Sequence, residues 1–159
     1  LEDYEKAVTF CQDKKGAFLY ASNFSLGVNI FFELNRKLAR LMKEFGAYDV
    51  AIEEIHHIQK KDAPSGTAIT LAQDIIASND KYDYWKLEGS DAKSLNISSK
   101  RIDNVPGTHS IDYRSEIDSI SIKHEAHNRT GFGFGAVIAA EWIMGKSGVF
   151  TMNDVLNIG

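Results

Sequence analysis

The spacing of hydrophobic residues along the chain predicts several helices. In the segment Val28–Phe45, apolar side chains recur every three or four residues and form a wide face, which is typical of a helix that packs on a core. Leu1–Lys15 and Ala68–Ala77 have the same period, and Gly135–Met144 also favours a helix. The segment Thr151–Leu156 predicts a short helix that begins at a capping threonine.

A two-residue period marks the strands. Between Ser119 and Ala126, apolar or aromatic residues alternate with polar ones, which predicts a strand with two different faces. Asp49–His56 alternates less regularly and is also predicted to be a strand. Leu95–Asp103 and Thr108–Arg114 are predicted to be partner strands, separated by a turn at Asn104–Gly107.

Two further segments complete the predicted organisation. Ala17–Ala21 is a continuous apolar run, which indicates a strand buried on both faces. A helix followed by such a strand is what the last unit of a doubly wound α/β domain leaves at its end. The polar stretch Ser78–Ser94 predicts a surface connection. Helices with a largely separate run of strands indicate the α+β class, with a mixed or antiparallel sheet packed on helices.

Composition narrows the class of protein. Of the 159 residues, 43% are hydrophobic and 25% charged, as in ordinary soluble globular proteins. The net charge is −4 and the basic residues are scattered, so no nucleic-acid partner is expected. No apolar run reaches the length of a membrane span, and no membrane partner is expected. Because the chain begins at Leu1 without methionine and enters a helix at once, we expect that the N-terminal part of a larger protein is missing.

The single cysteine, Cys11, cannot form a disulfide within the chain. It lies on the apolar side of the first predicted helix, where a buried structural thiol is a better interpretation than a nucleophile. This cysteine usage fits a reducing cytoplasm.

Groups that transfer protons and bind anions gather between Glu54 and Ala68. His56 and His57 precede two lysines, Lys60 and Lys61, of which one is expected to be solvated and the other to hold the substrate or supply a proton. The Pro-Ser-Gly-Thr turn at residues 64–67 then opens a helix, whose free N–H groups bind anions. The same turn also suits ordinary helix capping, and both roles can coexist. We predict an active-site loop for a small, negatively charged substrate.

Two other motifs are better explained by structural roles than by metal or dinucleotide binding. Adjacent histidines in an extended segment point to opposite faces, so His56 and His57 cannot easily bind one metal ion, and no metal is expected. His109, His124 and His127 could complete a zinc site only if folding brought them there. The glycine-rich run at residues 131–135 misses the dinucleotide-binding spacing, so we interpret it as packing of the last long helix on the sheet.

Several motifs together resemble one known family. The segment Lys60–Ala68 reads Lys-x-Asp-Ala-Pro-Ser-Gly-Thr-Ala after the paired histidines, and Asn23–Asn29 precedes it in the manner of a hinge signature. Further motifs match in order and spacing: Gly107-Thr108-His109, Ile122-Lys123-His124, Arg129, Gly135-Ala136-Val137, Gly145-Lys146 and Asp154-Val155-Leu156. This set resembles the dihydrodipicolinate reductase family over essentially the whole chain.

The resemblance implies an NAD(P)H-dependent oxidoreductase of the diaminopimelate and lysine pathway. The family reduces 4-hydroxy-tetrahydrodipicolinate, after loss of water, to tetrahydrodipicolinate with NADH or NADPH. It implies that His56 is the proton donor and acceptor, and that Lys60 is a proton donor. It also implies that His57, Gly66 and Thr67 bind the dicarboxylate substrate. The residues implied to contact the nicotinamide cofactor are Ala21, Ser22, Asn23 and Phe24.

The resemblance further implies the domain organisation and assembly. Residues 1–24 would end a nucleotide-binding Rossmann domain, residues 25–146 would form the substrate-binding and oligomerisation domain, and residues 147–159 would return to the Rossmann domain. A homotetramer assembled through the sheet is expected. The family's Gly-rich phosphate loop is absent, so little or no activity is expected of this chain alone. The alternatives are a non-catalytic ligand-binding or assembly module and a histidine-ligated zinc hydrolase.

Overall fold

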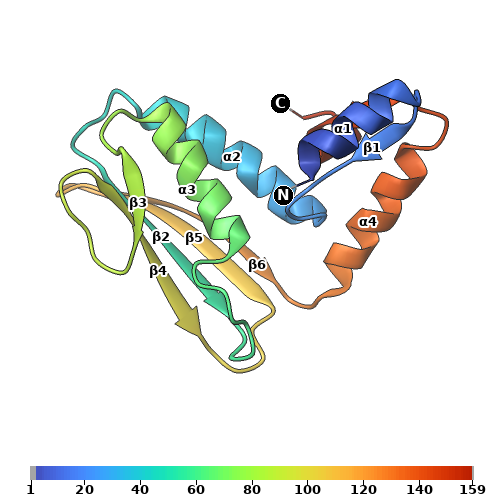
Figure 1. Cartoon of the computed structure of the whole chain (residues 1–159). Helices are drawn as coiled ribbons and strands as arrows, with labels where there is room; N and C mark the ends of the chain where they lie inside the picture. Colours follow the sequence, from blue (N-terminus) through green and yellow to red (C-terminus); the bar gives the residue numbers. More distant parts are fainter. Residues whose placement is uncertain (1–2, 159) are drawn as a thin grey trace. The chain divides into compact units, whose positions relative to one another are not determined.

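The structure, a computed structural model, describes residues 3–158 (Figure 1). The chain divides into two compact units, one made of residues 30–129 and the other of residues 1–29 and 130–159. The larger unit holds a mixed five-stranded sheet with helices on one face, which confirms the predicted α+β class. Within residues 3–158, no helix is both long and apolar enough to cross a membrane.

The sheet of the larger unit has the strand order β3-β4-β2-β5-β6. The five strands are β2 (Asp49–His56), β3 (Tyr84–Leu87), β4 (Ser94–Arg101), β5 (Gly107–Arg114) and β6 (Ser119–Ala126). β4 runs parallel to both β2 and β3, whereas β5 runs antiparallel to β2 and β6. The central position of β2 explains its buried inner face, on which Val50, Ile52 and Glu54 are all at most 5% exposed.

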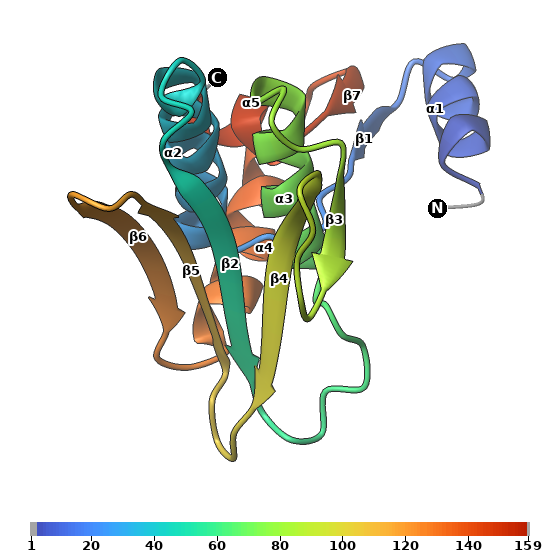
Figure 2. The ribbon, with the colours of Figure 1, turned by 90° about the vertical axis from the view of Figure 1, so that its left-hand side faces the viewer.

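Two helices cover one face of this sheet (Figures 1 and 2). The helix α2 (Leu26–Met42) carries the apolar face that its spacing predicted, and α3 (Gly66–Ser78) is apolar along its inner side. Asn35 is fully buried between them and donates from Nδ2 to the Leu71 carbonyl oxygen at 3.0 Å. The other face of the sheet bears no helix of this unit.

The smaller unit consists of short elements. They are α1 (Tyr4–Asp13), β1 (Ala17–Leu19), α4 (Thr130–Trp142), β7 (Gly148–Phe150) and α5 (Met152–Leu156). β1 and β7 pair in parallel and form a two-stranded sheet. Thr151 caps α5 as predicted, because its N–H and hydroxyl groups both donate to the Asp154 carboxylate. Cys11 is buried, also as predicted, whereas Leu1 lies outside the described residues.

Four local predictions were wrong. The connection Ser78–Ser94, predicted to be a surface connection, contains β3. The two segments predicted to be partner strands are β4 and β5, and they do not pair with each other because β2 lies between them. β1 is only partly buried, because within residues 3–158 it pairs along one edge with β7. The glycine run lies inside α4, which begins five residues before the predicted start.

Candidate active site

The alternation of β2 places Glu54 and His56 on the same buried face of the sheet. Glu54 is 0% exposed and His56 is 9% exposed, and both lie under the helix layer. His57 follows on the other side of the chain, partly exposed, and its Nδ1 donates to Gln59 Oε1 at 3.0 Å. The two adjacent histidines therefore face different surroundings, as the extended geometry predicted.

The Glu54 carboxylate is held by donors from several elements. Its Oε1 accepts from Ser99 Oγ at 2.7 Å, from Arg101 Nη2 at 3.1 Å and from the Ser65 backbone N–H at 3.3 Å. Its Oε2 forms an ion-pair contact with His56 Nδ1. A buried carboxylate is tolerated only when it is paired in this way.

Burial alone raises the pKa of Glu54, because it penalises the charged form. The hydrogen bonds from His56, Ser99 and Arg101, together with the charge of His56, outweigh that effect and hold the pKa well below its usual range. Glu54 is therefore an anion at neutral pH.

Arg101 connects Glu54 to the loop that carries the predicted lysine. Its guanidinium donates to the backbone carbonyl oxygens of Lys60 at 3.3 Å and Asp62 at 2.6 Å. The Lys60 ammonium donates to both carboxylate oxygens of Asp62 at 2.8 Å. The hydrogen bond from Lys60 lowers the pKa of Asp62. The loop is thus held in place by its backbone, and Lys60 keeps a charged partner.

A second histidine joins the cluster from β5. His109 is 4% exposed, its ring centroid lies 5.1 Å from that of His56, and its Nε2 is 3.1 Å from Ser65 Oγ. Burial lowers the pKa of His109 to about 3, and the charge of His56 acts in the same direction. His109 is therefore neutral at physiological pH.

Ser65 opens the predicted anion-binding helix. Its Oγ accepts from the Ala68 N–H at 3.2 Å, so it is the N-cap of α3. Gly66, which is exposed, is the first residue of this helix, and Thr67 follows it. This places an anion-binding helix start beside the His56–His109 pair.

The predicted site residues fall into two groups. His56, Lys60, Gly66 and Thr67 belong to one unit and are linked through Glu54, Arg101 and Ser65. Ala21–Phe24 belong to the other unit, directly after β1. There, Asn23 Oδ1 accepts from the Ser25 N–H at 2.9 Å, and the Phe24 carbonyl lies against Gly135 of α4. Gly135 of the glycine run thus packs on this segment.

Glu54, His56 and His109 also form a group that could hold a metal ion. One possible ligand atom from each residue lies within 4.8 Å of the others. The Arg101 guanidinium, 3.1 Å from Glu54, opposes a cation there, and the carboxylate already accepts two further hydrogen bonds, from Ser99 Oγ and the Ser65 N–H. The arrangement therefore suits proton transfer near a bound anion better than metal binding.

Sequence reasoning missed the groups that support His56. Glu54 was visible at two residues before His56 on the same strand face, but its role depends on Ser99 and Arg101. Both of those residues come from β4, and the parallel pairing of β4 with β2 was not predicted. His109 was considered as a possible metal ligand and as part of the motif Gly107-Thr108-His109, with no supporting role for His56.

The chain matches the family described as dihydrodipicolinate reductase, C-terminus, over residues 27–156. The chain belongs to the dihydrodipicolinate reductase family. The 4-hydroxy-tetrahydrodipicolinate reductase of Christiangramia forsetii is 56% identical over 157 residues, which is 99% of this chain and 66% of that protein. The reductase of the same name from Rickettsia rickettsii is 38% identical over 88% of this chain and 59% of its own length.

A solved structure shares the fold of this family member. Dipicolinate-bound dihydrodipicolinate reductase from Paenisporosarcina sp. TG-14 aligns with a TM-score of 0.67 at 24% identity, covering 94% of this chain and 58% of that one. The chain therefore spans between about half and two thirds of the length of the relatives that it matches.

Proposed function

We propose that this chain is the substrate-binding and proton-transfer part of a 4-hydroxy-tetrahydrodipicolinate reductase of the diaminopimelate and lysine pathway. The observation that carries the proposal is the Glu54–His56–His109 cluster beside the start of α3. It combines a histidine with a fixed partner and an anion-binding helix end. The names of its relatives support the same reaction.

In the proposed reaction, the N–H groups at Gly66 and Thr67 hold one carboxylate of a cyclic imine dicarboxylate. His57 contacts the substrate from the exposed side of the strand end. His56 exchanges a proton with the substrate, and the Lys60 ammonium stabilises developing negative charge or delivers a proton. Buried, neutral His109 keeps Ser65, and with it the helix start, in position.

The proposed cofactor is NADH or NADPH, which supplies the hydride when bound. The residues at hand fit this group, because Ala21, Ser22, Asn23 and Phe24 follow the carboxyl end of the parallel strand β1. Ligands of open parallel sheets bind at that end of the strands. We propose that residues 1–24 and 147–159 belong to a Rossmann domain and that residues 25–146 form the substrate-binding domain.

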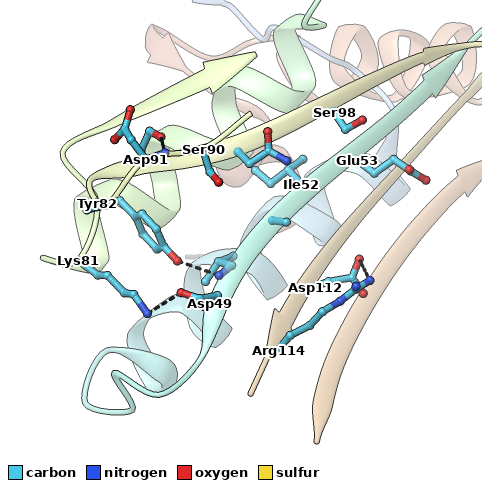
Figure 3. Close-up of a pocket in the computed structure, with 15 residues that line it drawn as sticks. Asp49, Ile52, Glu53, Lys81, Tyr82, Ser90, Asp91, Ser98, Asp112 and Arg114 are labelled. Carbon is cyan, nitrogen blue, oxygen red and sulfur yellow. Dashed lines mark hydrogen bonds and ion pairs between the residues drawn. The ribbon is translucent and has the colours of Figure 1, made fainter. Parts of the chain in front are cut away.

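The proposed assembly is a homotetramer formed through the open face of the sheet. This face contains a cavity of about 670 Å³, lined by residues of β2, β4 and β5 and by residues 81–82 and 90–92 beside them (Figure 3). Asn96 Oδ1 is buried there without a hydrogen-bond partner among residues 3–158, and a facing subunit could supply one. Ala51→Arg, in the middle of this face, should shift the mass measured by light scattering from tetramer to smaller species. A variant that stays tetrameric would contradict this assembly.

Ligand binding tests the function directly. Pyridine-2,6-dicarboxylate should bind this chain in calorimetry, and His56→Ala should abolish turnover in the full-length protein while the fold is retained. Turnover that survives in His56→Ala would favour the non-catalytic module. The biosynthetic relatives and the single buried cysteine support a cytoplasmic location.

A zinc hydrolase is the second candidate, because the ligand atoms of Glu54, His56 and His109 converge. Metal analysis of purified protein, together with a zinc titration monitored by calorimetry, tests it. Stoichiometric zinc that is lost in His109→Asn would support the hydrolase over the reductase.

A further inference from the structure

The two oxygens of the Glu54 carboxylate have different partners. Oε1 accepts three hydrogen bonds, from Ser65 N–H, Ser99 Oγ and Arg101 Nη2. Oε2 faces Nδ1 of His56. One oxygen is thus fully used to fix the carboxylate, and the other is presented to the imidazole.

The donors to Oε1 come from the parts of the site that must be aligned with His56. Ser65 starts the proposed substrate-binding helix, and Arg101 holds the backbone of the Lys60 loop through the carbonyl oxygens of Lys60 and Asp62. Glu54 is therefore the group on which the histidine, the lysine loop and the helix start converge. Its complete burial keeps water from competing for these contacts.

The opposite side of the imidazole has room at Nε2. A Cβ at Gly107 would lie 3.1 Å from this nitrogen, so the glycine leaves the space beside it unfilled. With Nδ1 turned to Glu54, Nε2 is the ring nitrogen available for proton exchange.

We propose that Glu54 is the positioning residue of the site, which holds a proton on Nδ1 of His56 and directs Nε2 to the substrate. This inference rests on the proposed function. A carboxylate that accepts from one ring nitrogen sets the tautomer and orientation of the ring, and it stabilises the imidazolium when a proton arrives. Glu54 does not touch the substrate in this role.

Glu54→Gln makes a sharp test because a glutamine side chain has one acceptor oxygen. The three donors at the Oε1 position will take that oxygen, which leaves the amide NH₂ facing His56 Nδ1. Nδ1 must then accept a hydrogen bond, so the ring proton moves to Nε2. Nitrogen-15 NMR of the imidazoles in this chain should show the Nδ1–H form of His56 in wild type and the Nε2–H form in Glu54→Gln.

Glu53→Gln is the matched control for these imidazole signals. Glu53 is the adjacent residue of β2, and its carboxylate pairs with Lys100 on the other face of the sheet. The substitution removes the same charge from the same strand, and the His56 tautomer should stay on Nδ1–H.

Turnover in the full-length protein gives the second measurement. Glu54→Gln should lower kcat about 10²- to 10⁴-fold, the range seen when a catalytic histidine takes the wrong tautomer. KM should change less than about threefold, because the groups that bind the carboxylate remain. Glu54→Asp keeps the charge and should recover the Nδ1–H form and part of kcat.

An Nε2–H tautomer in the wild-type protein would overturn the proposal without any variant. An unchanged His56 tautomer and an unchanged kcat in Glu54→Gln would also overturn it. So would a loss of kcat in Glu54→Gln with no partial recovery in Glu54→Asp. If dicarboxylate binding and turnover are absent from wild type, the proposed function fails. The tautomer measurement still decides the role of Glu54 in that case.

Discussion

Gly135 lies against the carbonyl oxygen of Phe24, so closely that a Cβ at position 135 would come within 1.8 Å of it. The two residues belong to the same unit, Gly135 within α4 and Phe24 at the end of the segment predicted to contact the cofactor. The neighbouring atom is backbone and cannot move aside as a flexible side chain would. Glycine at this position is therefore a packing requirement of the Phe24 segment.

We expect Gly135→Ala to destabilise the protein by about 1–3 kcal/mol or more, the usual cost of overpacking. Gly133→Ala is the control, because it lies in the same helix and a Cβ there meets nothing within 4 Å. It should stabilise the helix by about 0.5–1 kcal/mol. Thermal unfolding of the two variants measures the contrast. Equal Tm values would contradict the close packing of α4 on Phe24.

The sequence predicted those elements whose own residues carry a clear period. α2 and β6 were found because apolar residues recur along them with the period of a helix and of a strand, and β2 because its first residues alternate. β3 was missed because its four residues lie in a polar stretch, and their pairing with β4 is what makes them a strand. The strand order was not predicted either, because the position of β2 between β4 and β5 depends on contacts between residues that are distant in sequence.

Acid should destabilise the protein through His109. Its pKa is lowered to about 3 by burial, so between pH 6.5 and about 3 the unfolded chain protonates this histidine and the folded one does not. The unfolded state then binds more protons, and the free energy of unfolding falls as the pH falls. The slope for one histidine is at most about 1.4 kcal/mol per pH unit.

His109→Asn should flatten this slope, as measured by urea unfolding between pH 5 and 6.5. That pH window lies above 4.5, the ordinary pKa of the Glu54 carboxyl. The contribution of Glu54 to the free energy of unfolding is therefore lost only in more acidic solution. Burial also lowers the pKa of His124, so a smaller slope should persist in the variant. If His109→Asn keeps the full wild-type slope, His109 is not the neutral buried group described here.

The candidate site was predicted only where neighbours in sequence share the chemistry. The stretch from His56 to Thr67 carries the histidines, the lysine and the helix start in one segment, so their types and order were enough. Arg101 and His109 lie on other strands, and their proximity follows from the sheet register alone. The supporting groups of an active site are for this reason harder to predict than the groups that react.

Gly107 should control the position of the His56 imidazole ring. In Gly107→Ala, the new Cβ would approach Nε2 to 3.1 Å and displace the imidazole by a few tenths of an ångström. Small misplacement of a catalytic group is costly, so kcat of the full-length protein should fall about tenfold or more. Gly46→Ala, where a Cβ meets nothing within 4 Å, should leave kcat unchanged. Comparable kcat values for both variants would mean that the ring adjusts without consequence.

The proposed carboxylate site at the start of α3 can be tested by removing one N–H group. Gly66 is the first residue of the helix, a position where proline fits well, and Ser65 before it is extended with ψ of 153°, which suits a residue preceding proline. Gly66→Pro should therefore fold, yet it lacks the amide that would face the ligand.

We expect Gly66→Pro to weaken the binding of pyridine-2,6-dicarboxylate about tenfold, as the loss of one hydrogen bond to a charged group predicts. Gly66→Ala keeps the N–H, and its Cβ meets nothing within 4 Å, so its affinity should equal that of wild type. Calorimetry on the three proteins compares them directly, with thermal unfolding as the check on folding. Equal affinities for Gly66→Pro and Gly66→Ala would place the carboxylate away from this amide, because proline changes the donor at residue 66 whereas alanine changes only its side chain.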